Sequence, residues 1–169
     1  MAFQIGEKVV YPNQGIGIIE SVSARSFGST VERYYLLRLA CGSMTVMVPF
    51  SHVSDVGLRK ITSNGEWSRV LTFLSSGRCV CCRDWKNRFK ENSEKMRAGH
   101  PLHLAEVLKS LLLLQRQKPL SFREKRMLDQ AGHMLILELA TSRGMQQEDA
   151  AGVIHRALGK TGLELPPPR

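Results

Sequence analysis

The chain has 169 residues, of which 43% are hydrophobic, and it carries 24 lysines and arginines against 15 acidic residues. This composition excludes wholesale disorder, and the formal net charge of +9 favours a polyanionic partner. Apolar runs reach only four residues and the first eight residues lack a signal-peptide pattern, so we expect neither membrane insertion nor secretion.

The cysteines favour a cytoplasmic protein. Cys79, Cys81 and Cys82 crowd into four residues, with Cys41 far from them, which is not the framework of a disulfide-rich secreted domain. We expect all four to be reduced thiols.

Charge and residue type divide the chain near residue 62. Before this point β-branched residues, aromatics and glycines are frequent, and after it Leu, Glu, Lys, Arg and Met dominate. Residues 1–77 carry 7 basic and 5 acidic side chains, whereas residues 78–169 carry 17 and 10. We predict an α+β protein with a small β domain over residues 1–62 and an all-helical domain over residues 63–165.

The first domain is predicted to contain four short strands. Glycine and polar clusters mark turns at 12–15, 26–29 and 41–43. In the last strand Val46 and Val48 share one face and Met47 takes the other. Short strands at this spacing are typical of a small antiparallel barrel. The expected strands are Lys8–Tyr11, Gly15–Val22, Tyr34–Ala40 and Met44–Val48.

The second domain is predicted to contain five helices. Apolar residues recur at helical spacing, and Ser121 with Glu124 forms a capping box at the start of the longest helix. The expected helices are Glu66–Leu74, Asp84–Arg97, a stretch around Leu104–Leu112, a long helix after Ser121, and Gln147–Leu158.

The segment that follows the cysteines is a candidate DNA-binding helix. Lys86 and Lys90 fall on one helical face with Arg97, and Trp85 lies in the first turn. Cations beside an exposed aromatic suit DNA, because the cations bind phosphates while the ring wedges between bases. The alternative is that Trp85 and Phe89, four residues apart, are ordinary core and the charges form a solvated face.

A second basic cluster, formed by Arg123, Lys125 and Arg126, opens the long helix. Backbone N–H groups at a helix N-terminus favour anions, so this cluster is a candidate phosphate site. Residues 78–126 hold 13 basic and 5 acidic residues, so both clusters lie in the most positive stretch of the chain. A merely solvated surface is the alternative reading of the second cluster.

Metal, redox and catalytic sites find little support in the sequence. A CxxC spacing at Cys79 and Cys82 is followed by His100 and His103, but Pro101 between the histidines favours a loop over a ligand-bearing face. No phosphate-loop, hydrolase-elbow or zinc-protease motif occurs. We therefore predict no catalytic residue, no metal site, no cofactor and no enzymatic activity.

Three separated motifs carry a family resemblance. Residues 3–15 read FQIGEKVVYPNQG, residues 85–96 contain the pattern W-x-x-R-[YF]-x-x-N-x-E-K, and AEVL at 105–108 precedes LSxxEKRML at 120–128. Together they resemble the CarD/CdnL family of bacterial transcription regulators, in continuous order over residues 2–142. The resemblance implies a Tudor-like first domain, similar to the RNA-polymerase-interacting domain of the transcription-repair coupling factor, that docks on the polymerase β-subunit lobe.

The resemblance further implies that the helical domain contacts promoter DNA at the upstream edge of the melted bubble. The family tryptophan that matches Trp85 wedges into the minor groove there, and basic residues around it contact the DNA backbone. The expected DNA-binding residues are Trp85, Lys86, Arg88, Lys90, Lys125 and Arg126.

Some positions depart from the family pattern. Met47 stands where the family has a second interface arginine besides the one that matches Arg25. Asp84 replaces the commoner Asn, and Asn87 stands where a basic residue is frequent, so we expect weaker DNA binding with a smaller salt dependence than in a typical member. The expected polymerase-binding residues are Arg25, Ser26, Phe27 and Met47.

These observations predict a monomeric, cytoplasmic transcription regulator that associates with the nucleoid through RNA polymerase and stabilises the open promoter complex. Its DNA binding should be weak and largely independent of sequence. The alternative is an adaptor that tethers RNA polymerase to another protein without productive DNA contact. A redox or zinc protein is the third class considered.

Overall fold

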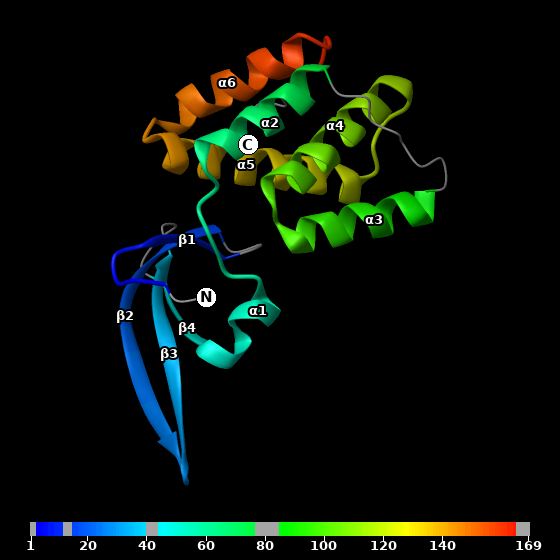
Figure 1. The fold of residues 1–169 in the computed structure, drawn as a ribbon. Coiled ribbons are helices and arrows are strands. Elements are labelled where there is room, and N and C mark those ends of the chain that lie inside the picture. Colours follow the sequence, from blue (N-terminus) through cyan, green and yellow to red (C-terminus); the bar gives the residue numbers. More distant parts are fainter. Residues whose placement is uncertain (1–2, 12–14, 40–43, 77–84, 165–169) are drawn as a thin grey trace. The chain divides into compact units, whose positions relative to one another are not determined.

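The computed structural model describes residues 3–11, 15–39, 44–76 and 85–164 (Figure 1). It divides into two compact units, Met1–Ile61 and Thr62–Arg169. The first contains an antiparallel sheet and the second contains helices, so the predicted α+β class is confirmed.

The first unit is a five-stranded sheet in the order β4-β3-β2-β1-β5, in which all neighbouring strands are antiparallel. A 3-10 helix, η1 (Phe50–His52), and a one-turn helix, α1 (Val53–Val56), connect β4 to β5. In Figure 1, β2 and β3 run on together beyond the other strands of the sheet. The strands are β1 (Lys8–Tyr11), β2 (Gly15–Phe27), β3 (Thr30–Leu39), β4 (Thr45–Pro49) and β5 (Arg59–Lys60).

The four predicted strands are present, but the hairpin between β2 and β3 is longer than predicted. The turn expected at 26–29 shrinks to two residues between Phe27 and Thr30, and Gly28 takes the left-handed φ of 64° that this tight reversal needs. The turn residues 12–14 and 41–43 lie outside the described residues. β5 was not predicted, because two residues are too few to show an alternating pattern.

Tyr35 organises the core of the sheet. Its side chain is buried, its hydroxyl accepts a hydrogen bond from the Phe3 backbone N–H at 3.0 Å, and its ring stacks on Phe50 with centroids 4.2 Å apart. Val9, Ile19, Leu37, Val48 and Leu58 complete the buried cluster.

Glu7 stabilises the N-terminal turn. Its pKa is lowered because its carboxylate accepts a hydrogen bond from the Gln4 N–H and lies near Lys60.

A β-bulge at Glu20 sets which residues of the hairpin share a face. Ile19 pairs with Leu37 on the buried face, whereas Ser21 pairs with Leu36, so Glu20 is an extra residue in β2. Side chains alternate along a strand, and one extra residue therefore exchanges the two faces for the rest of β2. Because of the bulge, Arg25 lies on the sheet face opposite to that of Ile19.

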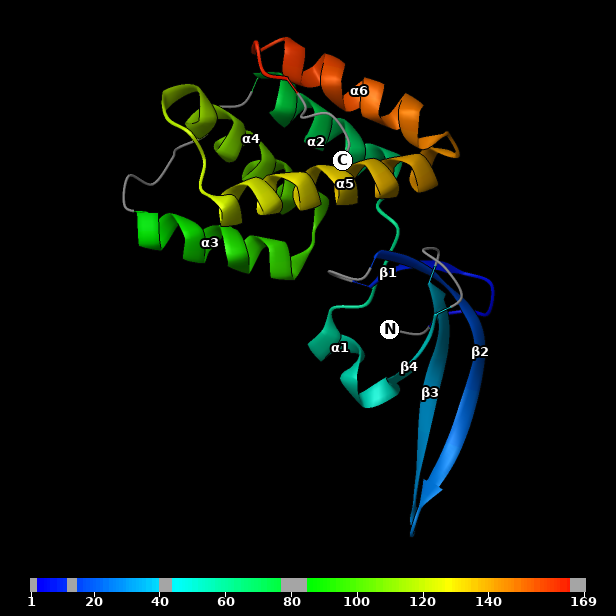
Figure 2. The ribbon, with the colours of Figure 1, turned by 180° about the vertical axis from the view of Figure 1, so that it is seen from behind.

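The second unit contains the five predicted helices, and Figure 2 shows them from behind. α4 packs against α2, α3 and α5, and α6 packs against α2 and α5. The capping box of Ser121 and Glu124 is confirmed. In the described ranges, no helix has the length and apolar character needed to cross a membrane. The helices are α2 (Asn64–Ser76), α3 (Trp85–Ala98), α4 (Pro101–Gln117), α5 (Phe122–Arg143) and α6 (Gln147–Gly159).

Helix α4 is the centre of the helical core. Most of its leucines are buried, and they form one core cluster with Trp67 of α2 and Leu139 of α5. Lys109 is also buried, and its Nζ donates to the backbone oxygen of Phe73 at 2.7 Å in the last turn of α2. A cation at this end of a helix satisfies a terminal carbonyl and complements the helix dipole. The lysine thereby joins α4 to the end of α2.

The expectation of a loop at Pro101 was wrong. Pro101 is the first residue of α4, and His100 is its N-cap, with Nδ1 accepting the Leu102 N–H at 3.3 Å. Proline suits this position, because the first helical N–H has no partner within the helix and the ring fixes a helical φ.

The start of the helical unit is fixed by α5. The backbone N–H and the Oγ1 hydroxyl of Thr62 both donate to Glu138 Oε1, at 3.3 and 3.0 Å, and Ser142 Oγ donates to the Thr62 carbonyl at 2.7 Å. Glu138 is only 2% exposed, so these bonds are shielded from water. They attach the chain to α5 just before α2 begins.

Candidate functional site

A buried ion pair joins the start of α3 to the start of α5. The Arg88 guanidinium donates from Nε and from its terminal nitrogen to Glu124 Oε2, at 3.2 and 3.1 Å. Both side chains are 4% exposed. The sequence placed Arg88 in the DNA-binding set, but in this structure its charge lies inside the helical unit and is paired there.

The same carboxylate also caps α5. Glu124 Oε1 accepts from the Ser121 backbone N–H at 3.3 Å and from Ser121 Oγ at 3.1 Å, while Ser121 Oγ accepts the Glu124 N–H at 3.2 Å. One oxygen of Glu124 therefore holds the N-cap of its own helix and the other holds Arg88 of α3. Charge-assisted bonds in a buried setting are strong and directional, so they fix both the distance and the orientation of the two helix starts.

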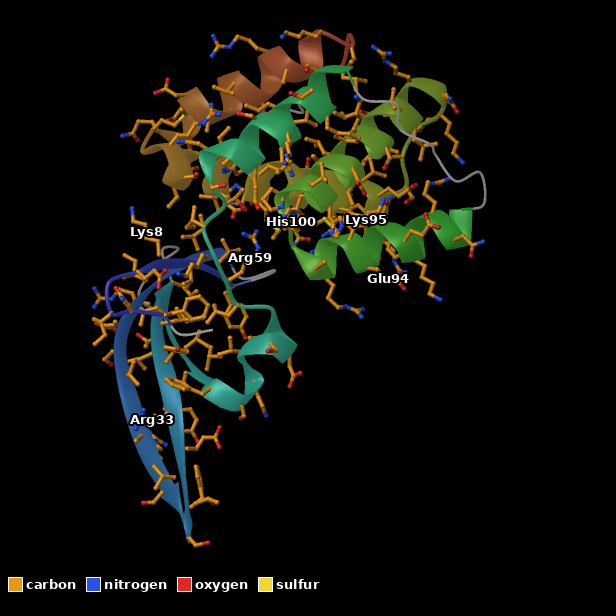
Figure 3. All side chains as sticks on the ribbon, in the orientation of Figure 1. Lys8, Arg33, Arg59, Glu94, Lys95 and His100 are labelled. Carbon is orange, nitrogen blue, oxygen red and sulfur yellow. The ribbon has the colours of Figure 1, made fainter. Side chains whose placement is uncertain are left out.

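Among the described side chains of α3, few of the fully buried ones are apolar. The buried side chains described on α3 recur every four residues, at Arg88, Asn92 and Met96. Of the described α3 residues, only Met96 belongs to the apolar core. Lys95 adds a partly exposed ion pair with Glu106 of α4 at 2.9 Å. Polar contacts therefore supply much of what holds α3 in place. Figure 3 labels Glu94 and Lys95 on α3 and His100 at the start of α4.

Exposed cations lie near both helix starts. α3 begins at Trp85, one turn before Arg88, with Lys86 next to it, and Lys90 is exposed on the same helix. On α5, the basic residues that flank Glu124 are exposed. The buried ion pair thus brings the beginnings of two basic segments together, although 36 residues separate Arg88 from Glu124 in the chain. The exposed α5 cations are Arg123, Lys125 and Arg126.

Phe122 was missed in the sequence. It is the first residue of α5 and is 70% exposed, and the Arg126 guanidinium lies 5.9 Å from its ring centroid. A signal was present in the sequence, because a residue directly after an N-cap serine belongs to the first, outer turn of the helix and need not face the core.

The cysteines and histidines that were considered as metal ligands, and not favoured, are only partly described. Cys79, Cys81 and Cys82 lie outside the described residues. His100 and His103 lie with ring centroids 5.8 Å apart, and His100 Nδ1 is used in the α4 cap. Among the described residues, no group of three or more metal-binding side chains converges.

The β unit carries its candidate residues on the long hairpin and on β4. Arg25 pairs across the strands with Glu32, Phe27 pairs with Thr30, and Met47 pairs with Leu36. Side chains of directly opposed residues share a face, so the register brings Arg25, Phe27 and Met47 to the face opposite the core. Phe27 is 58% exposed and Met47 is 37% exposed.

Ser26 is separated from the other three predicted residues of the β unit. It pairs with Val31, which lies on the same face of β3 as the buried Tyr35 and Leu37. Ser26 therefore lies on the core-side face of the hairpin. A partner on one face would contact Arg25, Phe27 and Met47 without Ser26.

Sequence comparisons match both units to one family. Residues 3–62 match the family model described as the CarD-like/TRCF RID domain, and residues 69–155 match the one described as CarD, C-terminal domain. The chain belongs to the CarD/CdnL family. The resemblance seen in the three sequence motifs is therefore confirmed, as is the Tudor-like character of the first unit.

A curated relative supports the same assignment. A Bacillus subtilis (strain 168) protein named "Putative transcription factor YdeB" is 34% identical over 146 residues, which cover 86% of this chain and 95% of that protein. The solved structure "CdnLNt from Myxoccoccus xanthus" is 34% identical, with a TM-score of 0.33, over 38% of this chain and 90% of that one. CarD/CdnL proteins are transcription regulators whose first domain interacts with RNA polymerase, and they are not an enzyme family.

The buried ion pair can be tested by removing its cation. Arg88→Met leaves the Glu124 carboxylate buried without its main counter-charge, and it should lower the free energy of unfolding of the helical unit by about 3–5 kcal/mol. Lys95→Met, on the same helix, breaks the partly exposed pair with Glu106 and should cost no more than about 1 kcal/mol. Urea unfolding measures both losses. A loss for Arg88→Met no larger than that for Lys95→Met would contradict the assignment.

Proposed function

We propose that this protein binds the RNA polymerase β-subunit lobe through its β unit and the upstream edge of the promoter bubble through its helical unit. By holding both, it stabilises the open complex. The observation that carries the proposal is the buried Arg88–Glu124 pair, because it fixes the start of α3, with Trp85, beside the basic start of α5.

On the DNA side, the exposed cations neutralise backbone phosphates and release bound counterions, which gives affinity without base recognition. Lys90, Lys125 and Arg126 are suited to this by their exposure, and Lys86 by its place beside Trp85. Trp85 acts as the wedge in the minor groove at the edge of the bubble. Arg88 contributes by positioning the two helix starts, since its own charge is paired with Glu124.

On the polymerase side, Arg25 supplies a charge-assisted bond to an acidic group of the β lobe, and Phe27 supplies an exposed aromatic contact. In the described part of the chain, Arg25 makes no ion pair, so its guanidinium is available to a partner. Met47 adds apolar surface on the same face.

The mechanism is differential binding to two states of the promoter. Contacts with a melted edge exist only after the DNA opens, so they shift the closed-to-open equilibrium toward the open state. Two contacts worth about 1 kcal/mol each would raise the open-to-closed ratio by roughly thirtyfold at 25 °C.

An adaptor role is the second candidate. Met47, where the family resemblance places an arginine, lies opposite Leu36 and makes this part of the sheet face more apolar. An adaptor would bind polymerase and a second protein but would show no DNA binding at any ionic strength.

Trp85→Ala tests the wedge. Wild type should lengthen the lifetime of the open complex formed by purified polymerase, and Trp85→Ala should lose most of that effect while still binding polymerase. Asn87→Ala changes an exposed residue of the same turn and should retain the wild-type effect. Competitor-challenged decay of the open complex measures all three. If wild type does not change the lifetime, the proposal fails and the adaptor role takes its place.

Arg25→Ala tests the polymerase contact. Loss of a charge-assisted bond should weaken binding to polymerase about tenfold or more. Arg33→Ala is the matched control. Arg33 is exposed on the same hairpin (Figure 3), but it pairs with Ala24 and therefore lies on the face opposite to that of Arg25. Binding of the full-length variants to core polymerase distinguishes them. Equal weakening by both substitutions would contradict recognition through the face that carries Arg25.

A further inference from the structure

Phe122 is an exposed aromatic ring set among cations. It is 70% exposed, and the guanidinium of Arg126, four residues later on α5, lies 5.9 Å from the centre of its ring. At this distance a cation is attracted by the face of an aromatic ring, so the two side chains form one surface feature rather than two independent ones. Phe122 does not contribute to the buried core of the helical unit.

The charge around Phe122 is one-sided. Arg123, Lys125 and Arg126 are exposed, whereas the acidic residue in the first turn of α5 is Glu124, which is 3% exposed and paired with Arg88. The pairing withdraws the negative charge of this turn from the surface and leaves the positive charges there. The ring is therefore surrounded by groups that bind phosphates and repel cationic partners.

Exposed aromatic rings beside a cationic track are the usual means of binding single-stranded nucleic acid. A base that is no longer paired can stack on the ring while arginine and lysine hold the backbone on either side, and an arginine at the ring adds cation–π attraction. Bases within a duplex are stacked on each other and do not offer their faces to such a ring. A single strand therefore matches both the aromatic and the charge of this surface.

We propose that Phe122, with Arg126 beside it, is a stacking platform for an unpaired base of single-stranded DNA, with Arg123 and Lys125 binding the adjacent phosphates. The inference rests on the proposed function and deepens it, since it assigns the melted strand, in addition to the duplex edge, to the helical unit. Stacking of one base contributes about 1–3 kcal/mol, which corresponds to a change in affinity of roughly 5- to 150-fold.

The experiment compares a short fluorescent oligothymidylate with a duplex of the same length, using the full chain at low ionic strength. Phe122→Leu should weaken single-strand binding by roughly tenfold, within the range for one stacked base, and leave duplex binding and the salt dependence unchanged. Phe122→Trp, which keeps a stacking ring, should retain the single-strand affinity. Lys125→Met should weaken binding to both DNAs and reduce the salt dependence, because it removes a phosphate contact.

Two results would overturn the platform. One is single-strand binding by Phe122→Leu equal to that of wild type. In that case the exposed ring would serve to contact a protein partner and not a base. The other is an equal loss for single strand and duplex, which would make Phe122 a general structural residue; thermal unfolding of the variant checks this directly. If Phe122 does not stack on a base but Trp85→Ala still loses the lengthening of open-complex lifetime, the proposed function stands without the platform.

Discussion

The ion pair between Arg88 and Glu124 is the constraint on which the charged surface of the helical unit depends. It places an arginine and a glutamate in the interior, where leaving either one unpaired would be strongly unfavourable. A buried pair of this kind is not an efficient source of stability, because apolar side chains of similar volume often do as well. Its value here lies in position: one carboxylate holds the cap of α5 with one oxygen and the side of α3 with the other.

The same pair determines the charge that the surface presents. Because Glu124 is internal and neutralised, the first turn of α5 exposes cations without the acid that caps it. In the β unit a single extra residue has a comparable effect. The bulge at Glu20 exchanges the faces of β2, so that Arg25 and Phe27 share a face with Met47 instead of lying on the core side. In each unit a single structural feature, the ion pair or the bulge, determines which residues are exposed to a partner.

Periodicity and capping signals were sufficient to predict most of the architecture. Alternation gave the first four strands, apolar spacing gave the five helices, and the spacing of Ser121 and Glu124 gave the capping box, because each of these depends on residues close together in the chain. The features that were missed depend on distant residues or on one-residue shifts. Nothing near Arg88 indicates a partner 36 residues away, and nothing near Glu20 indicates a bulge. Pro101 was assigned to a loop because the same residue serves both to end helices and to begin them.

The central claim is that Arg88 positions the DNA-binding surface without touching DNA, and the salt dependence of DNA binding tests it most directly. The double variant Arg88→Met/Glu124→Gln leaves no unpaired buried charge and keeps a side chain that can complete the capping box, and circular dichroism would verify its fold. We predict that its slope of log K against log[salt] equals that of wild type, whereas Lys125→Met reduces the magnitude of this negative slope by about 0.9, the contribution of one phosphate contact. A folded double variant whose slope is reduced in magnitude as much as that of Lys125→Met would show that Arg88 binds a phosphate itself and would contradict this role of Arg88.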